Sequence, residues 1–201
     1  MKAAEQVQRW AVVVACLAAV VAIRTWVGRP MLVRGHSMKP TLFDGDLVWL
    51  DALHRNVELG DIAAYTARNG EQRVKRVVAI GGERIGVQEG QLVRAGAVVP
   101  IERLGMAENW KDAAQVLPLA KLNAERFRET VGREHEAQRF HPSTSAPDQA
   151  VPSDAIFLVG DNRDDSIDDR ADGPTPRSKI EGRVRWVLIS MTRRRFFLEA
   201  P

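Results

Sequence analysis

The sequence predicts a mainly β protein with an N-terminal transmembrane helix and a small, partly helical insertion. Three observations support this fold class. An apolar run lies near the N-terminus of the 201-residue chain, short apolar segments separated by turn residues fill 30–100, and residues 104–140 are rich in alanine, glutamate and arginine. We expect a cytoplasmic tip and membrane anchor at 1–29 and one domain at 30–201, with the insertion at about 100–152.

The apolar run covers 14 residues, from 10 to 23, and two basic residues precede it. A membrane-spanning helix usually has about 20 apolar residues, but flanking tryptophans and a snorkelling Arg24 would extend this run. A cleaved secretory signal has the same length and charge pattern, and a lipoprotein signal at Cys16 is a third alternative. We expect an uncleaved anchor that crosses the membrane once.

Short strands are expected in order along residues 30–100. The segments are 47–50, 61–66 and 73–80, followed by a hairpin within 84–101 around Glu89-Gly90 and Ala95-Gly96. The dipeptide Asn69-Gly70 is a strong signal for a two-residue hairpin turn between the second and third segments. Further along, we expect a helix at about 119–138, a loop at 142–153, and strands at 156–159 and 184–191.

The two-residue turn predicts a register that bears on Lys75. In this register Ala64 lies opposite Lys75, and small or apolar side chains surround the lysine on its face of the sheet. Burial without a counter-charge lowers the pKa of a lysine from about 10.4, which suits a base that works near neutrality. On the other face, Arg76 lies diagonal to Asp61, within reach of an ion pair.

Bulk composition excludes some classes of function. The net charge of +3, from 29 basic and 26 acidic residues, is too small to indicate nucleic-acid binding, and no recognition motif with interleaved aromatic residues supports it. The single cysteine, Cys16, excludes an intramolecular disulfide and leaves the redox compartment open.

Three blocks of sequence carry the candidate chemistry. Their sequences are Arg-Gly-His-Ser-Met-Lys-Pro-Thr-Leu at 34–42, Arg-Val-Lys-Arg-Val-Val at 73–78 and Gly-Asp-Asn-Arg-Asp-Asp-Ser-Ile-Asp-Asp-Arg at 160–170. A serine such as Ser37 is inert until a base takes its proton. The four histidines lie in no recognisable triad context, and His36 would point to the opposite face in an extended segment. Lys75 is therefore the better candidate for the base.

These blocks, in this order behind an apolar N-terminal segment, resemble type I signal peptidases, which are membrane-anchored serine proteases with a Ser/Lys dyad. The resemblance covers the anchor and most of 30–80 and 155–191. It implies a β-barrel-like or β-sandwich catalytic domain, with Ser37 as the nucleophile and Lys75 as the general base. No cofactor is expected.

The resemblance also implies supporting roles. Ser166 would hydrogen-bond the lysine amine and orient it, and Asp168 and Arg170 would form a structural ion pair beneath the site. The backbone N–H of Ser37 is a candidate donor to the oxyanion. Some family members add a hydroxyl two residues before the nucleophile, but Gly35 stands there in this chain.

The third block also invites a comparison with calcium-binding loops, because its aspartates alternate. Arg163 and Ser166 occupy the positions where such a loop needs a ligand and a glycine, so we expect no metal. The chain departs from the family pattern at Asp169, where serine is frequent.

By resemblance, the protein would be a membrane-bound serine endopeptidase that removes N-terminal signal peptides from secreted preproteins. Its substrates would carry small residues, commonly Ala-x-Ala, before the cleaved bond. The catalytic domain would lie on the outer, periplasmic face of the cytoplasmic membrane. Trp186 and residues 193–197 would contact lipid, or would simply form a final strand and basic tail.

Two other functions remain open. A self-cleaving Ser/Lys regulator would share a Gly-x-Ser-Met motif, and would need a DNA-binding domain where this chain has its apolar segment. A catalytically inactive, membrane-tethered binding module would retain peptide binding without turnover. Cleavage that depends on Lys75 would exclude the second of these.

Overall fold

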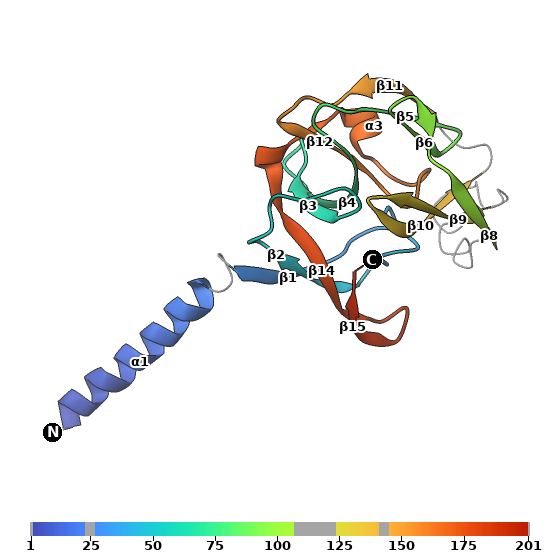
Figure 1. Ribbon diagram of the computed structural model, residues 1–201. Coiled ribbons are helices and arrows are strands. Elements are labelled where there is room, and N and C mark those ends of the chain that lie inside the picture. The colour runs from blue at the N-terminus through green and yellow to red at the C-terminus, as the bar shows by residue number, and fades with distance from the viewer. Residues whose placement is uncertain (1, 23–26, 107–123, 141–144, 201) are drawn as a thin grey trace.

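The computed structural model describes residues 2–22, 27–106, 124–140 and 145–200 (Figure 1). The chain begins with helix α1 (Lys2–Ala22), which extends away from the strands in Figure 1. Strands make up most of the rest, so the mainly β fold expected from the sequence is confirmed.

The expected transmembrane helix is not found. Among the described residues, no helix is both long enough and apolar enough to cross a membrane. The reason lies in the composition of α1, because charged and amide residues occupy much of its first eight positions and its apolar part begins only at Trp10.

The largest sheet has the strand order β1-β2-β14-β3-β4-β12-β13, and β15 pairs with β14 at its side. All of these pairings are antiparallel. The strands are β1 (Gly28–Leu32), β2 (Leu47–Asp51), β3 (Ile62–Thr66), β4 (Gln72–Ile80), β12 (Ala155–Val159), β13 (Thr175–Pro176), β14 (Ile180–Ser190) and β15 (Arg195–Glu199). The strands predicted at 47–50, 156–159 and 184–191 correspond to β2, β12 and most of β14.

Two smaller sheets and two short helices complete the described fold. One sheet has the order β10-β9-β8 and the other the order β11-β5-β6-β7. Their strands are β5 (Arg84–Gln88), β6 (Gln91–Arg94), β7 (Ala97–Val98), β8 (Ile101–Met106), β9 (Ala124–Val131), β10 (Arg133–Phe140) and β11 (Ala146–Ala150). Helix α3 (Asp169–Asp172) and the 3-10 helix η2 (Arg177–Lys179) lie between β12 and β14.

The expected hairpin within 84–101 is confirmed. Its turns fall at Glu89-Gly90 and Ala95-Gly96, and all four residues have positive φ. Two consecutive residues with positive φ match the right-handed twist of the paired strands, which is why such turns favour glycine.

The hairpin of β3 and β4 differs from the prediction by one residue. The backbone N–H of Ala67 donates to the carbonyl of Glu71 at 2.8 Å, so three residues form the turn instead of two. Gly70, the last of them, has a φ of 82°, as expected for a type I turn followed by a bulge. Lys75 therefore lies opposite Ala63 and not Ala64.

The helix predicted at about 119–138 is wrong from residue 124 onward, and residues 119–123 lie outside the described part. β9 and β10 pair in an antiparallel hairpin whose turn is Gly132, with a φ of 68°. The composition suggested a helix, but burial alternates along β9, where Phe127, Glu129 and Val131 are buried. The predicted loop at 142–153 likewise contains β11 at Ala146–Ala150, which pairs with β5.

Apolar side chains from the main sheet form the core that positions the loops described below. One cluster packs Met38 and Leu42 against Val48, Ile62 and Val187, which brings the segment after β1 onto β2, β3 and β14. A second cluster fills the space between β4, β5 and β12. The segment that contains Ser37 is thus held against the sheet by burial of its own apolar residues.

Candidate active site

Ser37 lies in a turn between β1 and β2, not in the extended segment considered above. Two contacts from the third sequence block hold this turn. The backbone N–H of Asn162 donates to the carbonyl of Ser37 at 3.0 Å, and Asn162 Nδ2 donates to the carbonyl of His36 at 3.1 Å. Asn162 is fully buried, so these bonds fix the backbone of the Ser37 turn from the interior of the protein.

Gly160 permits this close approach. A Cβ at this position would lie 2.5 Å from the carbonyl oxygen of Ser37 and closer still to the hydroxyl of Ser166. Any side chain there would therefore push the third block away from the Ser37 turn.

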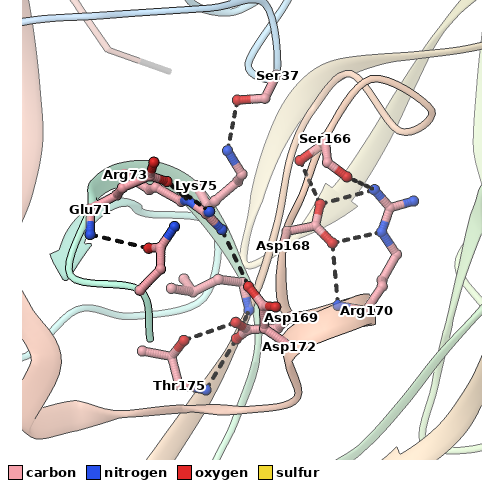
Figure 2. Close-up of polar contacts among 12 residues, drawn as sticks. Ser37, Glu71, Arg73, Lys75, Ser166, Asp168, Asp169, Arg170, Asp172 and Thr175 are labelled. Carbon is pink, nitrogen blue, oxygen red and sulfur yellow. Dashed lines mark hydrogen bonds and ion pairs between the residues drawn. The ribbon is translucent and has the colours of Figure 1, made fainter. Parts of the chain in front are cut away.

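Lys75 extends from β4 toward this turn (Figure 2). Its Nζ donates to Ser37 Oγ at 2.6 Å and to the carbonyl of Val74 at 3.1 Å. The two residues that the sequence singled out are therefore in direct contact, although they lie 38 positions apart. Lys75 is only 4% exposed, so its amine is removed from solvent.

Burial lowers the pKa of Lys75 to about 8. The negative charge of Asp168 opposes this shift, and the positive charge of Arg73 reinforces it. The register differs from the predicted one, but the expected direction of the pKa shift holds for the same reason, loss of hydration. A substantial fraction of this amine is neutral slightly above neutral pH, as a general base requires.

Asp168 is the centre of a buried polar cluster behind Lys75 (Figure 2). Its carboxylate accepts Arg170 Nε at 2.7 Å and Arg170 Nη2 at 2.9 Å, which is the ion pair implied by the resemblance. The backbone N–H of Gly160 also donates to it, at 2.9 Å. Burial alone would raise the pKa of Asp168, but Arg170 holds it below its usual value.

Ser166 takes a different partner from the one implied by the resemblance. Its hydroxyl donates to Asp168 Oδ2 at 2.6 Å, and the contact expected with Lys75 is not formed. The physical reason is the charge of the acceptor, because a carboxylate attracts a hydroxyl proton more strongly than a neighbouring amine does.

Arg76 also differs from the prediction. Its guanidinium binds Asp161 through Nε at 2.8 Å and Nη2 at 2.7 Å, and not Asp61. The one-residue register difference places Arg76 opposite Ile62, and from there it reaches the third block. Both partners are at most 1% exposed, and Arg76 lowers the pKa of Asp161 although burial alone would raise it.

Asp169 fixes the end of the third block. Its carboxylate accepts the backbone N–H of Leu158 at 2.8 Å, and the backbone N–H and hydroxyl of Thr175 at 3.1 and 2.8 Å. These contacts connect α3 to β12 and β13. Burial, together with the charge of Asp168, raises the pKa of Asp169 to about 7.

Ser37 and Lys75 face a groove of about 740 Å³. Its lining comes from three segments: residues 31–38, 71–75 and 164–167. Gly35 lies on one wall with a φ of 82°, and its backbone N–H donates to Asp44 Oδ1 at 2.7 Å. The positive φ at this position explains why a glycine stands there, and Gly35 brings no hydroxyl to the groove.

The sequence analysis gave no role to two residues that the structure brings to this site. Asn162 holds the Ser37 turn, and Arg73 lies on the same face of β4 as Lys75. Arg73 is expected on the face of Lys75, because residues two apart in a strand point to the same side, but that placement alone indicates no role for it. The backbone contacts of Asn162 could not be read from its position in the third block.

Comparison with known families agrees with this geometry. The model of the signal peptidase family, peptidase S26, matches residues 6–189. The chain belongs to this family. It is therefore a serine endopeptidase, and the three sequence blocks that resemble the family lie around one groove.

Two relatives illustrate the extent of the similarity. Signal peptidase I P of Bacillus subtilis subsp. natto is 29% identical over 155 residues, which cover 74% of this chain and 69% of the relative. Signal peptidase I of Bacillus amyloliquefaciens is 28% identical over 183 residues, which cover 89% of this chain and 85% of the relative. Among solved structures, a signal peptidase I from Enterococcus faecalis V583 matches 64% of this chain and 96% of its own, with 20% identity and a TM-score of 0.39.

Proposed function

We propose that this peptidase removes N-terminal signal peptides from secreted preproteins, with Ser37 as the nucleophile and Lys75 as the general base. The observation that supports this most directly is the 2.6 Å contact between Lys75 Nζ and Ser37 Oγ at the edge of the groove. A nucleophile needs a base within hydrogen-bond reach, and this pair meets that requirement.

The reaction begins with the neutral amine of Lys75. It takes the proton of the Ser37 hydroxyl as Oγ attacks the carbonyl carbon of the scissile peptide bond. The resulting ammonium then gives the proton to the leaving amine, which departs as the new N-terminus of the mature protein. Water, activated by the same amine, hydrolyses the acyl-enzyme and restores Ser37.

The developing oxyanion needs a hydrogen-bond donor in the groove. We assign the backbone N–H of Ser37 to this role, because the turn around it is fixed by Asn162. Gly35 offers no side-chain hydroxyl. Asp168 and Arg170 act less directly, by fixing the conformation of the third block, where Asp168 binds both Arg170 and the backbone of Gly160.

The substrate would bind as an extended segment along β4. β12 pairs with residues 76–80 of β4, so residues 72–75 have a strand partner only on the β3 side among the described residues. An extended peptide can hydrogen-bond to such an open strand edge. Small side chains, as in Ala-x-Ala, would let its backbone approach Ser37 closely.

The test is cleavage of a preprotein with an Ala-x-Ala site by full-length wild type and Ser37→Ala in detergent. We expect wild type to cut after the second alanine and Ser37→Ala to lose at least roughly 10³-fold in kcat/KM, since the nucleophile is gone. Ser178→Ala, in η2 and outside the groove, is the matched serine control. A folded Ser37→Ala protein that cleaves normally refutes the dyad, and a wild type that binds the preprotein without cutting it indicates a binding module.

We also propose that the enzyme works at the cytoplasmic membrane, with its catalytic domain on the outer face. α1 carries exposed apolar side chains, among them Trp10 and Leu17. At the end of the domain, Phe196 and Phe197 are exposed beside Arg195. Apolar and basic side chains together favour binding to an anionic lipid surface.

Vesicle flotation measures this association. We expect full-length protein to float with vesicles of anionic phospholipid, and the double variant Phe196→Ser/Phe197→Ser to float less at high salt, where charge attraction is screened. Extraction at alkaline pH then distinguishes an α1 that is embedded in the bilayer from an α1 that lies on the bilayer surface. Recovery of the wild-type protein in the vesicle-free fraction under all conditions contradicts the proposal.

A further inference from the structure

Arg73 shares its face of β4 with Lys75, two residues away along the strand. Consecutive side chains on one face of a strand stand about 6.6 Å apart, so the two cationic groups are neighbours. Both residues line the groove that contains Ser37. This places a second cationic side chain next to the amine that must lose its own charge.

The guanidinium of Arg73 is held in place from two sides (Figure 2). Glu71 accepts Nη2 at 2.9 Å and Nε at 3.3 Å, and Asp172 from α3 accepts Nη1 at 3.2 Å. Tyr65 lies directly opposite on β3 and is buried. The position of this charge is therefore set by the fold and not by a mobile surface side chain.

We propose that Arg73 is a positioning residue for the reaction: its fixed positive charge opposes a second positive charge on Lys75 and so keeps the amine able to accept a proton from Ser37. This inference rests on the proposed Ser/Lys dyad. It adds a residue to which the sequence blocks gave no role.

The partners of Arg73 do not cancel its effect. The side chain of Glu71 is 64% exposed and that of Asp172 is 35% exposed, whereas Arg73 is 17% exposed. Water therefore screens the two carboxylates more than it screens the guanidinium. Arg73 accordingly helps burial to lower the pKa of Lys75, while Asp168 raises it.

Other charges face this region from every neighbouring segment. The negative charges of Asp161 and Asp168 favour the protonated lysine, and Arg170 opposes it. On the β3–β4 side these groups are Glu71, Arg73 and the phenol of Tyr65. The third block and α3 contribute Asp161, Asp164, Asp165, Asp168, Asp169, Arg170 and Asp172. The segment around Ser37 contributes Arg34, which lines the groove, and His36 and Lys39, which act on Asp165.

The pH profile of kcat/KM tests the proposal. In wild type, activity should fall as the pH drops below about 8, where Lys75 becomes protonated. Arg73→Gln removes a positive charge and should move this acid limb to higher pH, whereas Arg73→Lys should leave it near the wild-type position. A shift of about half a pH unit corresponds to roughly a threefold loss of activity at pH 7.

Asp172→Asn changes the charge near Lys75 in the opposite direction. It removes a negative charge from beside Arg73, so the acid limb should move to lower pH. Two variants that shift the limb in opposite directions cannot be explained by general loosening of the site. The pH profiles are measured on full-length protein in detergent, with the same preprotein for each variant.

A second measurement does not depend on turnover. The chain contains six lysines, so the ¹³Cε signal of Lys75 can be assigned by comparison with Lys75→Met and titrated by NMR. The midpoint should rise in Arg73→Gln even if that variant no longer cleaves. An unchanged midpoint and an unmoved acid limb in Arg73→Gln overturn the inference. If the Lys75→Met variant still cleaves the preprotein, the dyad itself is overturned, which is a separate outcome.

Discussion

Lys75→Met is expected to lose roughly 10³- to 10⁴-fold in kcat/KM at pH 8, because general acid–base catalysis of this kind contributes factors of that size. Methionine fills a similar volume in the buried site, but its thioether is far too weak a base to take the Ser37 proton. Lys75→Arg should be equally inactive, since a guanidinium stays protonated at any accessible pH. The measurement is steady-state cleavage of an Ala-x-Ala preprotein by full-length protein.

The matched control for this experiment is Lys179→Met. Lys179 is exposed in η2 and lies outside the groove, so its replacement should leave kcat/KM unchanged. Circular dichroism spectra that match wild type would show that the Lys75 variants are folded. A folded Lys75→Met enzyme with activity within tenfold of wild type contradicts the assignment of Lys75 as the base.

Arg76→Met is expected to destabilise the protein by about 3–5 kcal/mol, which is the usual cost of leaving one member of a buried ion pair without its partner. Asp161 would keep its charge in a site that is 1% exposed, and the Thr41 hydroxyl would be its one remaining side-chain donor among the described residues. The double variant Arg76→Met/Asp161→Leu should recover much of this loss, because no uncompensated charge remains. Denaturant unfolding of the full chain in detergent measures the free energies.

An exposed ion pair serves as the control for the buried ion pair that Arg76 forms. Arg84 and Asp148 pair through side chains that are 58% and 43% exposed, so Arg84→Met should cost less than about 1 kcal/mol. A double variant as unstable as Arg76→Met would indicate that packing and the contact with the Gly60 carbonyl, not the charge, account for the effect.

The candidate site was easier to predict than the structure around it. Ser37 and Lys75 stand in long, unusual motifs, and motif identity does not require knowledge of the register. The register itself was missed because the number of residues in the turn depends on the conformation of Gly70, which the dipeptide alone does not specify. The ion pair of Arg76 was then assigned to the wrong aspartate for the same reason.

The strands β9 and β10 were missed because composition was weighed above alternation. Glu129 is 1% exposed and binds Arg163 and His135 inside the protein, so a charged residue whose type suggested a helix is in fact an interior side chain of a sheet. Burial lets Arg163 lower the pKa of Glu129 to about 2, although desolvation alone would raise it. Such compensation between distant residues is not visible in a local window of sequence.

Two adjacent residues of the third block reach opposite halves of the proposed dyad. Asp161 binds Arg76, the neighbour of Lys75 on β4, and Asn162 binds the backbone of the Ser37 turn. A single peptide unit therefore sets the distance between the proposed nucleophile and the proposed base. A change in the length of a hairpin elsewhere around the groove would alter the outline of the groove and leave this distance unchanged.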